Sequence, residues 1–186
     1  LLIAADGGAR HLLAIGAAPQ VLIGDLDSVA PEALAALAGR CEILRFPAEK
    51  NETDLELALL LAAERGATEI RVLAALGGRP DMHLANQLLL ALPALAGRDV
   101  ALLADGWSVR LVRSTLALRG APGRRVSLVP LGDARGVRTE GLRYPLRGEP
   151  LLLGPARGVS NEFEGAEALV SLEAGALLVF AEDGPI

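Results

Sequence analysis

The chain has 186 residues, of which 52% are hydrophobic, so it can bury one large core or two small ones. Its net charge of −5 argues against a general nucleic-acid-binding protein, which is usually basic. The apolar run at residues 57–63 is too short to cross a bilayer, and we expect no membrane partner. Cys41 has no second cysteine to pair with, which suits a cytoplasmic protein.

The first 105 residues alternate short apolar runs with stretches of helical period. The expected strands are residues 1–5, 21–24, 41–46, 69–74 and 100–104. The expected helices are residues 9–15, 31–38, 54–65 and 82–92. Strands that alternate with helices in this way predict an α/β domain with a mostly parallel sheet, covered on both faces.

After residue 105 the pattern changes to short β-type segments between Gly and Pro residues. These segments are residues 108–113, 125–130, 136–139, 141–144, 151–153, 168–172 and 177–180. No helix-length apolar period accompanies them, so this half is predicted to be an all-β sandwich. We therefore expect two domains, at residues 1–105 and 106–186.

Five aspartates lie in four turns that each follow an apolar run: Asp6, Asp25, Asp27, Asp54 and Asp81. If these runs are parallel strands of one sheet, all four turns meet at one edge of that sheet. Carboxylates crowd together stably around cations, and Mg²⁺ binds through a few carboxylates plus substrate phosphates. The aspartates therefore predict a magnesium site that faces a phosphorylated ligand.

The neighbouring residues suit phosphates as well. Gly7 and Gly78 each belong to a glycine pair that lets backbone N–H groups approach an anion. Lys50 and Arg79 supply positive charge. Neither glycine pair matches the pattern of a phosphate-binding P-loop or of a dinucleotide-binding turn, which disfavours an ordinary P-loop enzyme or NAD-dependent dehydrogenase.

Each turn also has a purely structural interpretation. Thr53 and Glu56 fit a capping box, and Asp81 can cap the following helix. A cap needs only one acceptor, however, whereas Asp25 and Asp27 offer two carboxylates on the same side of an extended segment. The group of turns therefore favours a binding site over a set of helix caps.

Two features of the second half also stand out. Tyr144 is the only tyrosine and is predicted to lie on a strand, either on the sheet surface or in the core. Ser160 and Asn161 form a polar pair that, taken alone, fits a plain turn.

In chain order, these motifs resemble the thiamine pyrophosphokinase family. The matching segments are Asp6-Gly7-Gly8-Ala9, Gly24-Asp25-Leu26-Asp27-Ser28, Lys50 with Thr53-Asp54, Gly77-Gly78-Arg79 with Asp81, Ser127-Leu128-Val129-Pro130-Leu131, Thr139 with Gly141-Leu142, and Ser160-Asn161. The resemblance implies an N-terminal domain that holds ATP and Mg²⁺ and a β-sandwich that contributes to a thiamine site. It also implies a homodimer with thiamine bound between subunits, and transfer of a pyrophosphoryl group from ATP to the thiamine hydroxyl with release of AMP.

The resemblance assigns roles to particular residues. It implies a catalytic and metal-binding set of Asp25, Asp27, Asp54 and Asp81. It implies that ATP and its phosphates contact Asp6, Gly7, Lys50, Thr53, Gly78 and Arg79. It implies that thiamine contacts Tyr144, Ser160 and Asn161.

The sequence departs from the family pattern at several positions. Tyr144 stands where the family often has Trp, and Asn51 stands where many members have Asp. Met82 precedes His83 where the family commonly has His directly after the aspartate, which leaves the role of His83 open. The first strand of the family is expected upstream of Leu1.

Three alternatives remain open at this point. The chain could be another Mg²⁺-dependent nucleotidyl or phosphoryl transferase, which would release a different product. It could be a thiamine- or nucleotide-binding module without catalysis. In a purely structural interpretation, every aspartate is a helix cap and Mg²⁺-dependent nucleotide binding is absent.

Overall fold

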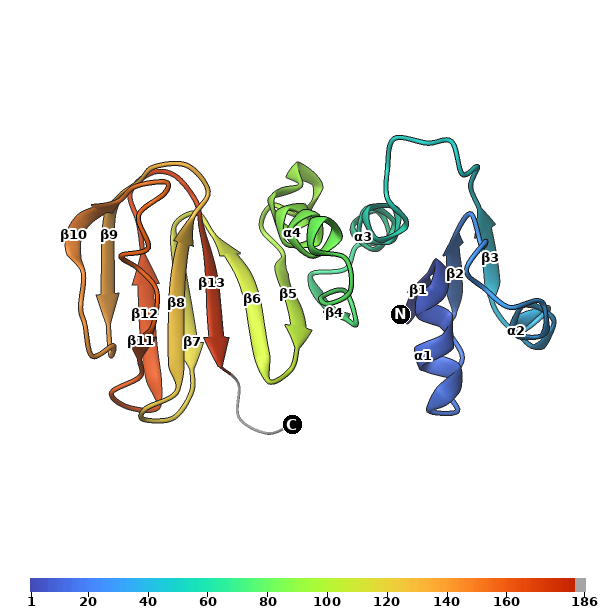
Figure 1. The fold of residues 1–186 in the computed structure, drawn as a ribbon, viewed down its shortest axis with the longest axis horizontal. Coiled ribbons are helices and arrows are strands. Elements are labelled where there is room, and N and C mark those ends of the chain that lie inside the picture. Colours follow the sequence, from blue (N-terminus) through green and yellow to red (C-terminus); the bar gives the residue numbers. More distant parts are fainter. Residues whose placement is uncertain (183–186) are drawn as a thin grey trace. The chain divides into compact units, whose positions relative to one another are not determined.

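The computed structural model describes residues 1–182, which form two compact units (Figure 1). The N-terminal unit comprises Leu1–Ile70 and Gly77–Asp99, and the C-terminal unit comprises Arg71–Leu76 and the chain from Val100 onward. The predicted fold class is confirmed, because a parallel sheet with helices is followed by antiparallel sheets. No helix within residues 1–182 combines the length and the apolar content that crossing a bilayer requires.

A three-stranded parallel sheet forms the centre of the N-terminal unit. Its order is β1 (Ile3–Ala5), β2 (Val21–Gly24) and β3 (Glu42–Arg45). Every residue of the central strand β2 is buried, as its continuous apolar run predicts for a strand covered on both faces. Leu22 on this strand and Leu26 just after it pack in one core with Ala4 and Leu37.

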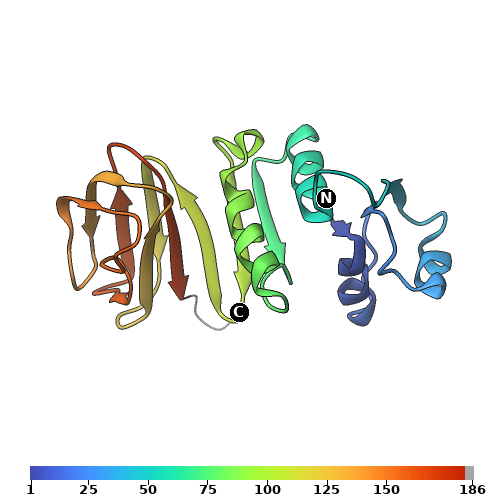
Figure 2. The ribbon, with the colours of Figure 1, turned by 45° about the horizontal axis from the view of Figure 1, so that its top comes forward.

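Helices follow the strands, with starts that the sequence explains. They are α1 (Ala9–Ala14), α2 (Pro31–Leu37), α3 (Asp54–Glu64) and α4 (Pro80–Leu88). α2 and α4 each begin with proline, whose fixed φ suits the first helical position. At the start of α3, the Thr53 hydroxyl oxygen accepts a hydrogen bond from the Glu56 backbone N–H at 3.2 Å, so the predicted cap is present. α1 lies beside β1 in both ribbon views (Figure 1, Figure 2).

Two sheets build the C-terminal unit. The six-stranded sheet has the order β11 (Asn161–Glu162), β8 (Arg125–Pro130), β13 (Leu177–Glu182), β6 (Trp107–Val112), β5 (Asp99–Ala104) and β4 (Glu69–Leu73). The four-stranded sheet has the order β10 (Arg147–Leu151), β9 (Ala134–Glu140), β12 (Glu167–Ser171) and β7 (Thr115–Arg119). One hydrophobic core joins side chains of both sheets, among them Val126 and Val179 from one and Val137 and Val170 from the other. The unit is therefore the expected sandwich.

The structure corrects several details of the sequence analysis. β4 and β5 were expected in the parallel sheet, but they end the six-stranded sheet. Residues 141–144 were expected to be a strand, but they form a turn with a single bridge between Leu142 and Phe163. β7 and β10 were not predicted as such, nor was the short strand β11.

Gly141 explains why the chain turns at that point. Its φ is +71°, a conformation that glycine adopts without strain. A Cβ atom there would lie 2.3 Å from the backbone carbonyl oxygen of Glu167 on β12. The turn therefore combines a left-handed backbone with close contact to the neighbouring strand.

Gly141→Ala is expected to lower the free energy of unfolding of the C-terminal unit by about 2–4 kcal/mol, because backbone atoms must move to admit the methyl group. The matched control is Gly123→Ala, which has φ +82° but open space around its Cβ position, and should cost about 1 kcal/mol. Urea unfolding followed by the fluorescence of Trp107 on β6 measures both variants. Equal losses in the two would show that the contact with β12 adds nothing.

Candidate functional site

The ends of β1 and β2 bring the first aspartates together. The two strands pair in parallel with Ala5 opposite Ile23, so the residues that follow them leave the sheet at the same edge. Oxygen atoms from the carboxylates of Asp6, Asp25 and Asp27 all lie within 4.8 Å of one another. The predicted pair of Asp25 and Asp27 is thus joined by Asp6, which was expected to face ATP.

The backbone after β2 turns sharply to create this cluster. Leu26 has φ +66° and only 4% of it is exposed, so its side chain enters the core between the two aspartates. One Asp25 carboxylate oxygen accepts a hydrogen bond from the Asp27 backbone N–H at 3.2 Å. Asp27 in turn accepts one from the Ser28 hydroxyl at 2.9 Å. These local bonds orient both carboxylates.

Lys50 connects this cluster to the start of α3. Its ammonium nitrogen lies 3.6 Å from an Asp25 oxygen and 3.1 Å from Oδ1 of Asp54, and 10% of its side chain is exposed. Gly24 makes the approach possible, since a Cβ atom at that position would lie 2.9 Å from Asp54 Oδ1 and 3.1 Å from the Cβ of Asp6. Four carboxylates therefore surround the end of β2, with the single lysine of the chain among them.

The contacts shift the pKa values of Lys50 and Asp25 toward the charged form of each group. The hydrogen bond to Asp54 raises the pKa of Lys50, and the charges of Asp54 and Asp25 raise it further. The backbone N–H of Asp27 lowers the pKa of Asp25, and the charge of Lys50 adds to this effect. Within residues 1–182, Oδ1 of Asp6 is shielded from solvent and has no hydrogen-bond partner. A buried carboxylate oxygen without a hydrogen-bond donor lacks a partner, and a bound cation can take that place.

Arg79 and Asp81 form a separate pair at the start of α4. The guanidinium group donates two hydrogen bonds to the carboxylate, at 3.1 Å from Nε and 2.5 Å from Nη2. This contact lowers the pKa of Asp81 and raises that of Arg79. Nearby, His83 accepts a hydrogen bond through Nδ1 from the backbone N–H of Gly77.

The four predicted metal ligands thus fall into three positions. Asp25 and Asp27 belong to the carboxylate cluster, Asp54 is joined to it through Lys50, and Asp81 is paired with Arg79. The turn that contains Asp81 follows β4, which belongs to a different sheet from β1 and β2. The assumption of one common sheet edge therefore holds for the first three turns at most.

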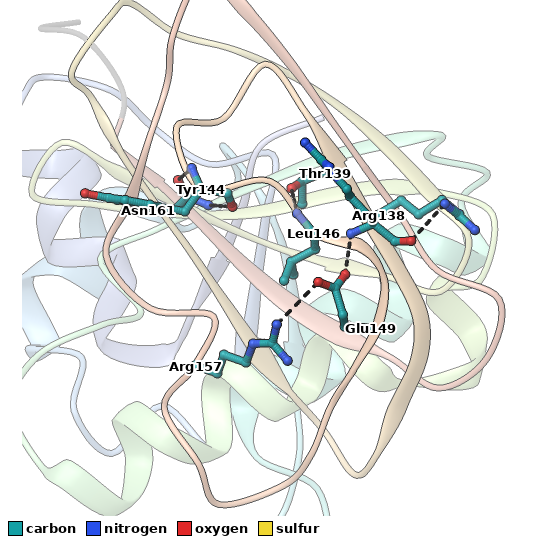
Figure 3. A network of polar contacts seen from close by, with 8 residues as sticks. Arg138, Thr139, Tyr144, Leu146, Glu149, Arg157 and Asn161 are labelled. Carbon is teal, nitrogen blue, oxygen red and sulfur yellow. Dashed lines mark hydrogen bonds and ion pairs between the residues drawn. The ribbon is translucent and has the colours of Figure 1, made fainter.

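A second site lies within the C-terminal unit (Figure 3). It is a cavity of about 460 Å³ between the turn that contains Tyr144 and the loop of residues 157–161. Tyr144, Ser160 and Asn161, the three predicted thiamine contacts, all line it. Arg143 and Arg157 line it too; no sequence signal pointed to them, because a surface arginine carries no motif.

Comparisons with known proteins find similar sequences for both halves of the chain. The sequence model of the thiamin pyrophosphokinase catalytic domain matches residues 1–101, and that of the thiamin pyrophosphokinase vitamin B1 binding domain matches residues 114–177. Thiamine pyrophosphokinase of Bacillus subtilis is 27% identical over 191 residues, which cover 96% of this chain and 86% of the relative.

Solved structures are similar over almost the whole chain. The crystal structure of thiamine pyrophosphokinase from Bacillus subtilis has a TM-score of 0.88 at 26% identity, covering 98% of this chain and 87% of the other. That of a thiamin pyrophosphokinase family protein from Enterococcus faecalis has a TM-score of 0.88 at 27% identity, covering 98% and 88%.

Lys50→Met is expected to lower the thermal unfolding midpoint by several degrees in EDTA, because the carboxylates around it lose their counter-ion. Added Mg²⁺ should raise the midpoint of this variant more than that of the wild type, since the ion replaces the missing positive charge. Differential scanning calorimetry with and without Mg²⁺ measures both effects. Arg65→Met, which breaks the partly exposed pair with Glu42, is the control and should show no dependence on Mg²⁺. An equal response of Lys50→Met and wild type would contradict the counter-ion role.

Proposed function

Since the chain belongs to the thiamin pyrophosphokinase family, we propose that it transfers a pyrophosphoryl group from ATP to the hydroxyl of thiamine. The thiamine oxygen attacks the β-phosphorus of ATP, and the bond from that phosphorus to the oxygen bridging it to the α-phosphorus breaks. The products are thiamine diphosphate and AMP. The observation that carries the proposal is the cluster of Asp6, Asp25 and Asp27, whose carboxylates gather at one sheet edge in the unit matched by the catalytic domain.

The cluster fits Mg²⁺ as the required ion. Its donors are carboxylate oxygens, which Mg²⁺ prefers, and Asp6 contributes a shielded oxygen that lacks a hydrogen-bond donor. Asp6, Asp25 and Asp27 would hold the ion. Asp54 and Asp81 are proposed to complete the acidic site. When bound, Mg²⁺ neutralises charge on the phosphate oxygens during transfer.

Residues of the chain itself orient the substrates. Lys50 and Arg79 are proposed to meet the phosphates of ATP, because both present positive charge beside carboxylates. Gly7 and Gly78 carry no side chain, which would let an anion approach their backbone N–H groups closely. One of the site's aspartates accepts the proton of the thiamine hydroxyl as the new bond forms.

Thiamine is proposed to occupy the cavity of the C-terminal unit. Tyr144, Ser160 and Asn161 line this cavity, which lies in the part of the chain that matches the vitamin B1 binding domain. The lone cysteine, Cys41, suits a reducing compartment, and we infer a cytoplasmic enzyme.

We further propose a homodimer in which a second copy completes the thiamine site. In a single subunit, large apolar side chains around the cavity and on the adjoining loop are exposed to solvent. They are Tyr144 at 58%, Leu152 at 50%, Leu153 at 65% and Val159 at 46% exposure. We infer that these exposed apolar side chains belong to the surface that the second copy covers.

Incubation with ATP, Mg²⁺ and thiamine is expected to yield equal amounts of thiamine diphosphate and AMP, measured by mass spectrometry. Asp25→Asn should reduce kcat by at least about 100-fold with the fold retained, because charge stabilisation at the phosphates is lost. Asp105→Asn, in the β5–β6 turn, is the control and should keep full activity. Free pyrophosphate as the product would instead identify a nucleotidyl transferase, and binding without ATP consumption would indicate a non-catalytic module.

Sedimentation equilibrium is expected to give twice the 19.3 kDa mass of one chain. Leu153→Arg should shift the protein toward the monomer, since a charge would enter the apolar interface. Arg119→Glu, on the edge strand β7, is the control for a change of surface charge and should leave the mass unchanged. A wild-type monomer with full activity would refute the shared site.

A further inference from the structure

The side chain of Asn161 makes its hydrogen bonds to backbone groups beside the cavity. Its Oδ1 accepts one from the Tyr144 backbone N–H at 2.9 Å and another from the Glu162 backbone N–H at 2.9 Å. Its Nδ2 donates to the Tyr144 carbonyl oxygen at 2.7 Å (Figure 3). Both acceptor sites of the amide oxygen are therefore filled, and one side chain holds both polar backbone groups of Tyr144. Only 8% of Asn161 is exposed.

The base of the same turn is held in a similar way. The hydroxyl of buried Thr139 accepts a hydrogen bond from the Leu146 backbone N–H at 2.8 Å. The Thr139 backbone N–H donates to the Leu146 carbonyl oxygen at 2.9 Å. Hydrogen bonds of Thr139 thus close the turn of residues 139–146 at its base, and those of Asn161 hold the turn at Tyr144.

The opposite wall of the cavity is attached to β8. The Leu128 backbone N–H donates to the Gly158 carbonyl oxygen at 2.8 Å, and the Ser160 backbone N–H donates to the Ser127 hydroxyl at 3.0 Å. A Cβ atom on Gly158 would lie 2.3 Å from the Leu128 carbonyl oxygen, so the loop lies tightly on the strand. Both walls therefore have a defined backbone.

The Tyr144 ring, by contrast, is presented to solvent. The residue is 58% exposed, and the guanidinium carbon of Arg143 lies 5.5 Å from the ring centroid. Packing in a core does not fix such a ring, so its place at the cavity depends on how firmly its backbone is held. A wall that is already ordered loses less entropy when a ligand binds.

We propose that Asn161 is a positioning residue that sets ligand affinity through Tyr144, in place of the direct thiamine contact that the family motif suggests. The identity of the ligand, thiamine, rests on the proposed function. The inference that Asn161 holds the backbone of Tyr144 rests only on hydrogen bonds within the C-terminal unit.

A double-mutant cycle tests how Asn161 acts on the ligand. Asn161→Ala and Tyr144→Ala should each raise the KM for thiamine by about tenfold with kcat changed less than about threefold, and the double variant should be no worse than Tyr144→Ala. If the effects of the two substitutions on KM multiply in the double variant, Asn161 contacts thiamine itself, and the proposal is overturned. An unchanged KM in Asn161→Ala, even with a lower unfolding midpoint, would reduce the residue to a structural role and would also overturn it.

A ligand-free measurement tests the holding of Tyr144 separately. Because Tyr144 is the only tyrosine, protein labelled with ¹⁵N-tyrosine gives a single amide signal. Hydrogen exchange of that amide should be at least about tenfold faster in Asn161→Ala. Asp133→Ala, which removes a similar bond to the Leu153 backbone N–H, is the control and should leave it unchanged. Unaltered exchange in Asn161→Ala would refute the positioning role.

The two measurements also separate this inference from the proposed function. A wild-type protein that neither binds nor converts thiamine would contradict the proposed function and the effect of Asn161 on thiamine affinity. The exchange rate of the Tyr144 amide would still decide whether Asn161 holds the turn.

Discussion

Repulsion among the carboxylates at the ends of β1 and β2 is the constraint on which the N-terminal unit depends. At separations near 4 Å, each pair of like charges costs about 1 kcal/mol in water and several times more where water is partly excluded. Lys50 offsets part of this cost through its contacts with Asp25 and Asp54. One lysine cannot neutralise four carboxylates, so the remaining negative charge favours a bound cation. Stability and ligand affinity therefore have the same electrostatic origin.

The cluster also requires backbone conformations that residues other than glycine seldom adopt. Asp6 has φ +40° and Leu26 has φ +66°, both in the left-handed region, and Gly24 has φ +142°. Such strain persists only where the surroundings enforce it, and it concentrates at functional sites. Here the enforcing element is the core beneath the turn, where Leu22 is fully buried and Leu26 nearly so. Hydrophobic packing thus holds the polar residues at the sheet edge.

Much of the N-terminal unit could be predicted because its signals are local. The bounds of β2 match the apolar run. Asp25 and Asp27 were expected to share a side because the segment was taken as extended; they do come together, but through a turn in which Leu26 has φ +66°. The sheet to which β4 belongs could not be predicted, because an apolar run does not specify its neighbour. β10 was predicted poorly because it is an edge strand that contains a proline, which edge positions tolerate. At Tyr144, the nearby Gly141 and the adjacent Pro145 outweighed β propensity.

The two candidate sites differ in how far residue types reveal them. An acidic site is visible in the sequence because the aspartates themselves are the ligands, and only their meeting needs a structure. The cavity of the C-terminal unit is shaped by hydrogen bonds between side chains and backbone, which residue identity does not disclose. Asn161 appears in the family motif whether it touches a ligand or holds Tyr144, so a motif cannot separate these roles. Its three hydrogen bonds favour the second role, because both acceptor sites of the amide oxygen and one of the two amide hydrogens are taken by backbone groups.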